Sequence, residues 1–419
     1  MHPHAHRILP DTGPPIPARL GAPVLSVVAV LLLALAVLVV TAPRASAAEL
    51  TPVPSFGADP GNLAMYEYVP DGLSDGAPLV VLLHGCTQSA ADYHRSSGWA
   101  EQAESSGLAL VYAEQRTANN ANRCFNWFEP GDVARGSGEA RSIASMVESA
   151  VSRHGLDTDR VFVSGLSAGG AMTAELLAAY PDLFAGGGIV AGVPVGCASG
   201  MIDAFTCMNP GKSLTPQQWG DRVRAKLPDG AEPPRVAIWH GTADTTVSPA
   251  NGRSSVAQWV NVLGLPSEPD GTESLPGPTT VEYYGGGAED AAVAYFSVAG
   301  MGHGTPVDPS AGCGAAGAHF LDTVCSAGYT ALFWGIGGSD GGPTDPPTGE
   351  PTGEPTEGPA EECVTASNHT HVAQGRAEHR LGYAYALGSG DPLGLWNTAV
   401  RTSLTETAAG HWELTPGGC

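Results

Sequence analysis

The residues of this chain best suited to chemistry lie in a Gly-x-Ser-x-Gly motif at residues 165–169, with Ser167 at its centre. The motif joins a predicted strand to a predicted helix at residues 171–180. Glycines two positions before and after Ser167 allow a sharp turn, so the hydroxyl stands exposed above a sheet. The amide of Ala168 would lie at a helix N-terminus, where N–H groups lack intrahelical partners and can bind an oxyanion. Ser167 is therefore predicted to be the nucleophile of an acyl-transfer reaction; the alternative is an incidental serine in a glycine-rich turn.

A serine nucleophile needs a general base and a carboxylate that orients the base. Serine hydrolases with this turn carry them in the chain order serine, aspartate or glutamate, histidine. Asp244 follows one predicted strand, and His303 lies in a glycine-rich loop after a later one. Asp244 is therefore predicted to be the carboxylate and His303 the base. The alternatives are Asp290 and His319, and Asp244 in its Gly-x-x-Asp loop can also serve only to cap a turn.

The loop after the first predicted strand is expected to supply the second oxyanion donor. Gly85 permits a close backbone approach there, and the amide of Cys86 would point at the oxyanion. His84, at the strand end, is predicted to be structural rather than an acid or base. Two further side chains are candidates for a substrate pocket, Trp127 and Gln88, and Trp127 can equally belong to the core.

Strand and helix patterns alternate through the part of the chain that carries these residues. The predicted strands are residues 79–83, 108–113, 160–164, 188–191, 235–240 and 292–298. Helical periodicity is clearest at residues 139–154 and 249–263. This alternation predicts an α/β fold, a mostly parallel sheet with helices on both faces. Active sites of such sheets lie at the carboxyl ends of the strands, where the candidate residues fall.

The first 47 residues have the pattern of a signal peptide. Residues 24–40 form an apolar run that follows Arg7 and Arg19, and Ala-Ser-Ala at residues 45–47 has the small-residue pattern of a cleavage site. The run is nearly long enough to span a bilayer, so a retained N-terminal anchor is the alternative. The cleavage pattern favours removal of residues 1–47. The mature protein is therefore predicted to be extracellular, without stable membrane association.

Eight cysteines in an exported chain predict disulfides. Eight cysteines permit 105 pairings, so the connectivity stays open at this point. Their spacing favours bonds between sequential neighbours: Cys86–Cys124, Cys197–Cys207, Cys313–Cys325 and Cys363–Cys419. No Cys-x-x-Cys pair or cysteine–histidine cluster has the spacing of metal ligands, so neither a metal nor another cofactor is predicted.

Composition argues against one class of partner and indicates where one folded part of the chain ends and the next begins. A formal net charge of −23 without a basic stripe argues against a nucleic-acid partner. Residues 337–362 are rich in Pro, Thr, Gly and Glu and cannot bury a core, so they are predicted to be a disordered linker. The linker would separate a catalytic domain at residues 48–336 from a small C-terminal module at residues 363–419.

The C-terminal module is near the lower size limit for an independent core, so a disulfide between its ends is expected to stabilise it. Its aromatic residues predict either a flat platform that binds an insoluble polymer or the core of the module itself. These residues are Tyr383, Tyr385, Trp396 and Trp412.

Four motifs follow one another along the chain: His-Gly-Cys-Thr-Gln at 84–88, Cys-Phe-Asn-Trp-Phe at 124–128, Gly-Leu-Ser-Ala-Gly-Gly-Ala-Met at 165–172 and Met-Gly-His-Gly-Thr-Pro-Val-Asp-Pro at 301–309. Together they resemble the extracellular polyhydroxybutyrate (PHB) depolymerase family of esterases, over most of residues 50–336. The resemblance implies an α/β-hydrolase fold, with Ser167, Asp244 and His303 as catalytic residues and the Cys86 amide in the oxyanion hole. Feruloyl and acetylxylan esterases are similar over the same motifs. The C-terminal module resembles a short unit appended to such esterases.

The combined interpretation is a secreted serine esterase that acts on an insoluble polyester, PHB or a related polymer, through an acyl-enzyme. The alternative is an enzyme that removes feruloyl or acetyl groups from plant polysaccharide. A non-enzymatic binding protein on a hydrolase scaffold is a further hypothesis. The presence of Ser167, Asp244 and His303 in the required order argues against it.

Overall fold

The computed structural model describes residues 48–288, 290–336, 363–380, 383–395, 400–408, 410–415 and 418–419. The predicted signal peptide, the predicted linker and Trp396 lie outside these residues. Within the described ranges, no helix is both long enough and apolar enough to cross a membrane.

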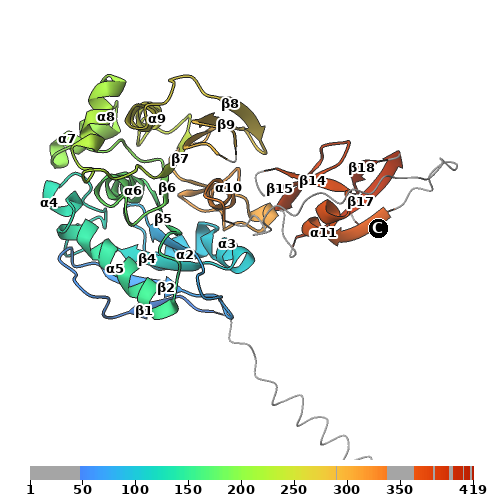
Figure 1. Ribbon diagram of the computed structural model, residues 1–419, viewed down its shortest axis with the longest axis horizontal. Coiled ribbons are helices and arrows are strands. Elements are labelled where there is room, and N and C mark those ends of the chain that lie inside the picture. The colour runs from blue at the N-terminus through green and yellow to red at the C-terminus, as the bar shows by residue number, and fades with distance from the viewer. Residues whose placement is uncertain are drawn as a thin grey trace, which may run out of the picture. The chain divides into compact units, whose positions relative to one another are not determined.

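A ten-stranded sheet forms the centre of the large domain (Figure 1). Six neighbouring strands run parallel: β4 (Ala109–Glu114), β3 (Leu79–Leu83), β5 (Val161–Leu166), β6 (Gly186–Val190), β7 (Arg235–Gly241) and β10 (Val293–Val298). Antiparallel strands extend the sheet at both edges: β1 (Thr51–Val53) and β2 (Ala64–Tyr68) at one, β9 (Thr279–Tyr284) and β8 (Gly271–Leu275) at the other. The sheet is therefore the mostly parallel one that the alternating pattern predicts.

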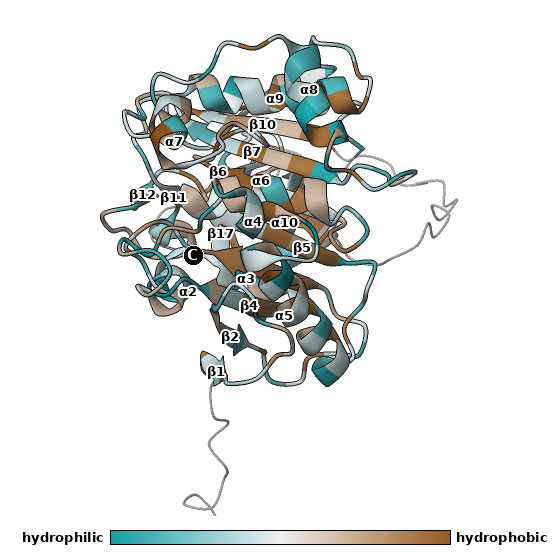
Figure 2. Ribbon diagram, turned by 90° about the vertical axis from the view of Figure 1, so that its left-hand side faces the viewer, coloured by the Kyte–Doolittle hydropathy of each residue, from teal (hydrophilic) through white to brown (hydrophobic). Residues whose placement is uncertain are grey.

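Helices cover both faces of this sheet, and strand β3 shows how. Its five residues are all buried and alternate between two cores. Leu79, Val81 and Leu83 pack on the side of α5 (Gly138–His154), α6 (Ala168–Ala179) and α9 (Ala250–Val262). Val80 and Leu82 pack on the side of α2 (Ala90–Ser96), α3 (Trp99–Ser106) and α10 (Ser326–Phe333). The central strands are accordingly hydrophobic along much of their length (Figure 2).

The predicted strands and helices exist, with boundaries that shift by a few residues. One such shift is at β6, which begins at Gly186 instead of residue 188. Its glycines leave room for tight packing: a Cβ on Gly187 would lie 2.4 Å from Cδ1 of Leu177 in α6. A run of glycines is a poor sequence signal for a strand, so the close approach of the helix explains why the boundary was misplaced.

Shorter elements lie in the connections of the large domain. They are α4 (Pro130–Val133), α7 (Met201–Met208), α8 (Pro216–Arg224), β11 (Thr305–Val307), β12 (Phe320–Asp322) and a 3-10 helix at Pro309–Ala311. Four disulfides are formed, with the pairing that the spacing favours: Cys86–Cys124, Cys197–Cys207, Cys313–Cys325 and Cys363–Cys419.

The described residues between 363 and 419 form two small three-stranded sheets and one helix. One sheet holds β13 (Cys363–Ser367), β17 (Arg401–Ala408) and β18 (His411–Leu414), and the other holds β14 (Ala377–Arg380), β15 (Tyr383–Ala386) and β16 (Pro392–Leu395), with α11 (Asn368–Ala373) between β13 and β14 in the chain. Trp412 is 7% exposed and packs in the core with Ala384 and Leu404. Tyr383 is also buried. Of the two interpretations of these aromatic residues, burial in this cluster favours the core of the module for Trp412.

Candidate active site

Ser167 occupies a strained turn between strand β5 and helix α6. Its φ is 57° and its ψ is −115°, and its amide donates to the carbonyl of Val190 at 2.9 Å. The flanking glycines are required by close contacts. A Cβ on Gly169 would lie 2.2 Å from the carbonyl oxygen of Leu83, and one on Gly165 would lie 2.5 Å from the backbone of Gly169. A positive φ at a non-glycine residue is uncommon and concentrates at functional sites. The turn therefore has the geometry of a nucleophile elbow.

The topology of the sheet brings the three predicted residues to one edge. Ser167 follows β5, Asp244 follows β7 and His303 follows β10. These strands are parallel, and only β6 lies between β5 and β7, while β7 and β10 are direct neighbours. The carboxyl ends of parallel strands meet at the same edge, where ligands bind in open α/β sheets.

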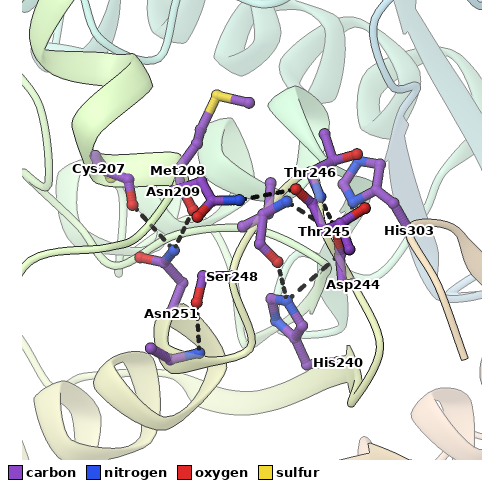
Figure 3. Close-up of polar contacts among 12 residues, drawn as sticks. Cys207, Met208, Asn209, His240, Asp244, Thr245, Thr246, Ser248, Asn251 and His303 are labelled. Atoms are coloured by element: carbon purple, nitrogen blue, oxygen red, sulfur yellow. Dashed lines mark hydrogen bonds and ion pairs between the residues drawn. The ribbon is translucent and has the colours of Figure 1, made fainter. Parts of the chain in front are cut away.

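Asp244 and His303 form a direct hydrogen bond, in which Nδ1 of His303 donates to Oδ2 of Asp244 at 2.7 Å (Figure 3). The other carboxylate oxygen of Asp244 accepts from the amides of Thr246 and Val247, at 2.8 and 2.9 Å. The side chain of Asp244 is fully buried and that of His303 is 13% exposed. The contact holds the imidazole with Nδ1 protonated, which leaves Nε2 free to accept a proton.

The loops that carry this pair are tied together by their backbones. The amide of Thr242 donates to the carbonyl of Val298, and the amide of Ala243 donates to the carbonyl of Met301, each at 3.0 Å. The amide of Gly300 returns a bond to the hydroxyl of Thr242 at 2.9 Å. The two loops therefore form one rigid support for the aspartate–histidine pair.

His240 is a second histidine at Asp244, and the sequence patterns did not assign it this place. It is the penultimate residue of strand β7 and is 1% exposed. Its Nε2 lies 2.9 Å from the carbonyl of Val247 and 3.5 Å from Oδ2 of Asp244 (Figure 3). Burial by itself would raise the pKa of Asp244, but the contacts with His240 and His303 and the Val247 amide outweigh it and hold the pKa below its ordinary value. Asp244 is therefore ionised at neutral pH.

The alternative acid and base occupy different positions. Asp290 is exposed and precedes β10, so it lies at the amino end of that strand, whereas His303 follows the carboxyl end. His319 is exposed, with its ring centroid 6.5 Å from that of His303. Asp244 is thus the carboxylate in contact with His303.

The loop that follows β3 is fixed by buried side chains. His84 is 1% exposed; its Nδ1 donates to the carbonyl of Gly85 at 2.7 Å, and its Nε2 accepts from the amide of Gln115 at 3.1 Å. Burial lowers the pKa of His84 to about 4, so the ring is neutral. Gln88 is also buried, and its amide oxygen accepts from the amide of Gly85 at 2.7 Å. Both side chains therefore shape the backbone just before Cys86.

The amides predicted to bind an oxyanion are unpaired. Neither the amide of Cys86 nor that of Ala168 donates a hydrogen bond within the part of the chain that the structure describes. Both residues line the same cavity as Ser167. Two free N–H groups beside a serine match the requirement for stabilising a tetrahedral intermediate.

The cavity at Ser167 has a volume of about 710 Å³. Trp127 lines it and is also 5% exposed within the core, so its position fits both of the interpretations considered for it. Gln88 is not among the lining residues. Further apolar side chains come from helix α7, among them Met201, Ala204 and Phe205. The cavity is large enough for a drug-sized ligand or a few repeats of a polymer chain.

A buried carboxylate holds one wall of this cavity from behind. Glu139 is 1% exposed and accepts from the backbone amide and the side-chain amide of Asn126, each at 2.8 Å. Gln115 donates to Glu139 and, at 3.1 Å, to the carbonyl of Cys124. Burial raises the pKa of Glu139 to about 8, although these hydrogen bonds oppose the rise. A buried glutamate at the start of a helix resembles an ordinary first-turn acid in sequence, so this role was missed.

Among the residues that the structure describes, no group of three or more histidine, cysteine, aspartate or glutamate side chains is arranged to hold a metal ion.

Comparisons with known proteins give consistent results. The family model described as Esterase PHB depolymerase matches residues 63–272. The chain is 46% identical over 311 residues to poly(3-hydroxyalkanoate) depolymerase C of Paucimonas lemoignei. This match covers 73% of this chain and 74% of that protein. It is 34% identical over 279 residues to feruloyl esterase B of Talaromyces stipitatus. This match covers 64% of this chain and 75% of that protein.

A solved structure supports the same assignment. An acetyl xylan esterase from Aspergillus awamori matches with a TM-score of 0.56 and 30% sequence identity, covering 61% of this chain and 94% of that chain. These three relatives are named as esterases or depolymerases. With its mostly parallel sheet, its serine elbow and these relatives, the chain belongs to the Esterase PHB depolymerase family and is a carboxylic ester hydrolase with an α/β-hydrolase fold.

Proposed function

We propose that this protein is a secreted serine esterase that hydrolyses the ester bonds of an insoluble polyester, poly(3-hydroxybutyrate). The observation that supports the mechanism best is the 2.7 Å contact between His303 and the buried Asp244, at the sheet edge that also carries the Ser167 turn. A buried aspartate held to a histidine is the arrangement that activates a serine in acyl transfer.

In the first half of the reaction, Oγ of Ser167 attacks the ester carbonyl while Nε2 of His303 takes its proton. Asp244 stabilises the imidazolium that forms and keeps the ring oriented. The amides of Cys86 and Ala168 bind the negative oxygen of the tetrahedral intermediate. His303 then gives its proton to the departing alcohol, and the acyl group remains on Ser167.

In the second half, water takes the place of the alcohol. His303 removes a proton from the water, which attacks the acyl carbonyl of Ser167 through a second tetrahedral intermediate at the same two amides. As this intermediate collapses, the bond between the acyl carbon and Oγ of Ser167 breaks and His303 gives its proton to Oγ, which releases the carboxylic acid and restores the serine hydroxyl. The apolar lining of the cavity suits the methyl and methylene groups of a hydroxybutyrate chain.

The substrate assignment draws on the relatives. The depolymerase of Paucimonas lemoignei has the higher identity, 46%, against 34% for the feruloyl esterase. A second candidate is hydrolysis of feruloyl or acetyl esters on plant polysaccharide, which the feruloyl esterase and the acetyl xylan esterase structure favour.

The remaining assignments belong to the same proposal. Residues 1–47 act as a signal peptide, residues 337–362 as a linker, and residues 363–419 as a module that docks the enzyme on its polymer. Four disulfides support export, because such bonds persist in oxidising compartments.

The mechanism is tested with Ser167→Ala on a soluble p-nitrophenyl butyrate. We expect kcat to fall by a factor of about 10⁴ or more, because the attacking oxygen is lost. Ser310→Ala, at an exposed serine, is the matched control and should keep full activity. Persistent activity in Ser167→Ala would refute the serine mechanism.

The substrate is decided by offering the wild-type protein a PHB suspension and, separately, a feruloylated or acetylated xylan. Clearing of the suspension with release of hydroxybutyrate supports the polyester assignment. Release of ferulate or acetate without clearing would transfer the assignment to polysaccharide, while leaving the serine mechanism intact.

A further inference from the structure

Helix α7 carries an unusual group of exposed hydrophobic side chains. Within the described residues, four large hydrophobic side chains are exposed, and three of them lie on this helix. Met201 is 56% exposed, Ile202 is 88% exposed and Phe205 is 67% exposed. Their spacing of three and four residues places them on one side of the helix. We call these three residues the apolar stripe.

The apolar stripe is continuous with the cavity at Ser167. Met201 and Phe205 line that cavity, together with Ala204 and Met208 of the same helix. Ile202 is not among the lining residues and is the most exposed of the three, so it extends the apolar surface outward from the rim. One hydrophobic surface thus leads from the predicted nucleophile to the outside of the domain.

The exposure of the apolar stripe is not the result of a loosely attached helix. The Cys197–Cys207 disulfide closes its C-terminal end, and the amide of Gly200, just before the helix, donates to the carbonyl of Phe128 at 2.7 Å. The side-chain amide of Asn251 donates to the carbonyls of Cys207 and Met208, each at 3.0 Å (Figure 3). Exposed apolar patches on a firmly held element mark interaction sites more often than accidents of packing.

We propose that the apolar stripe is the surface by which the catalytic domain itself adsorbs to a hydrophobic polyester, separately from the C-terminal module. This inference rests on the proposed function and narrows its substrate class. An insoluble polymer cannot enter a cavity whole, so a chain segment must reach Ser167 while the bulk stays at the rim. The apolar stripe is the part of the rim that such a bulk surface would cover.

The chemistry of the apolar stripe fits a polyester better than a polysaccharide. The stripe itself has no charged or hydrogen-bonding side chain, and the one acidic residue of α7, Asp203, is paired with Lys212 at 2.7 Å. Methyl and methylene groups of a polyester can cover such a surface and release water from it. The hydroxyl groups of a polysaccharide would lose hydrogen bonds to water there and gain none.

The test measures adsorption of the full chain to PHB films, with Ile202→Ser and the matched Ile202→Leu, each in the Ser167→Ala background so that the film stays intact. We expect Ile202→Ser to weaken adsorption about three-fold or more and Ile202→Leu to match the parent, because only the first removes apolar area. Adding Phe205→Ser to Ile202→Ser should weaken adsorption further. With Ser167 present, Ile202→Ser should hydrolyse p-nitrophenyl butyrate at the parent rate.

The outcomes separate this inference from the proposed function. If the parent adsorbs to and hydrolyses PHB but Ile202→Ser adsorbs equally well, the apolar stripe has no docking role and the proposed function stands. If the parent hydrolyses the soluble ester but neither adsorbs to nor clears PHB, both proposals fail. If Ile202→Ser weakened adsorption to acetylated xylan as much as adsorption to PHB, the assignment of the apolar stripe to a polyester would be wrong.

Discussion

The two halves of the candidate site are held in place by different forces. Ser167 takes its position from the backbone, through a positive φ and flanking glycines at which any side chain would collide with a neighbouring backbone. Asp244 and His303 take theirs from buried polar contacts: a 2.7 Å hydrogen bond between them and two backbone amides that fix the carboxylate. One half is built by steric fit and the other by electrostatics.

The difference has a practical consequence for substitutions. In the Asp244 half, an isosteric substitution that alters only charge and hydrogen bonding should lower the rate of the reaction and leave the fold intact. In the Ser167 half, the addition of a single methyl group to a flanking glycine should lower the stability of the fold.

Among the substitutions that compare the two halves, the largest effect is expected from Asp244→Asn. The asparagine oxygen can keep the bonds from Thr246 and Val247, but its amide group would face Nδ1 of His303 and force that atom to become the acceptor. Nε2 would then carry the proton and could not act as base. We expect kcat on a soluble ester to fall by about 10³–10⁴ with the melting temperature little changed.

The control for this exchange is Asp290→Asn, since Asp290 lies at the opposite end of its strand and is exposed. It should keep full activity. A loss for Asp244→Asn of less than ten-fold, or a large loss for Asp290→Asn, would contradict the assignment of the carboxylate.

A smaller but structural effect is expected from Gly169→Ala. Alanine is normally the better helix former by about 1 kcal/mol, so propensity alone predicts a gain in stability. The added Cβ would instead lie 2.2 Å from the carbonyl oxygen of Leu83, which belongs to a central strand and has little room to move. We expect the free energy of unfolding to fall by about 3 kcal/mol, measured by denaturant titration.

Gly131→Ala provides the comparison, because Gly131 also lies in a helix and nothing stands within 4 Å of its added Cβ. It should be neutral or slightly stabilising. If Gly169→Ala were equally harmless, the close packing of α6 on β3 would not be what positions Ser167.

A third prediction concerns the loop before Cys86, where steric fit and electrostatics meet. Burial lowers the pKa of His84 from 6.5 to about 4, so between these values the unfolded chain binds the proton more readily than the folded one. The stability that the neutral ring provides is therefore complete above pH 6.5 and is lost as the pH falls through 4. We expect this to remove up to about 3 kcal/mol from the free energy of unfolding.

The variant His84→Phe should remove that pH dependence. At pH 7 it should also cost about 2 kcal/mol, because the amide of Gln115 and the carbonyl of Gly85 both lose their partner. His84→Gln, which retains an acceptor, should cost less. An unchanged slope of stability against pH in His84→Phe would show that another group is responsible.

Much of the sheet could be predicted because its strands are simple in sequence. Strand β3 has five consecutive buried apolar residues, and its predicted bounds of 79–83 agree with the structure. The edge strands were missed for the opposite reason. Strand β8 has one buried residue in five, so its place in the sheet depends on backbone pairing with β9 rather than on a hydrophobic pattern.

The site shows the same division. Ser167 is marked by its own neighbours, since the glycines that its turn requires are adjacent in the chain. His240 and Glu139 carry no such mark. His240 lies only four residues before Asp244, but the two side chains meet because of the way the chain turns after β7. Glu139 meets Asn126, which lies in the loop before its helix. Neither contact follows from residue type.

By itself, the sequence determined the mostly parallel sheet, the serine turn and the order of serine, aspartate and histidine, because each depends on local pattern or on chain order. Only the tertiary structure decided that Asp244 rather than Asp290 meets His303, that the amides of Cys86 and Ala168 remain unpaired, and that the apolar stripe of α7 borders the cavity. Each of these features depends on how segments that are remote in the chain lie relative to one another, and the packing of the whole domain sets that arrangement.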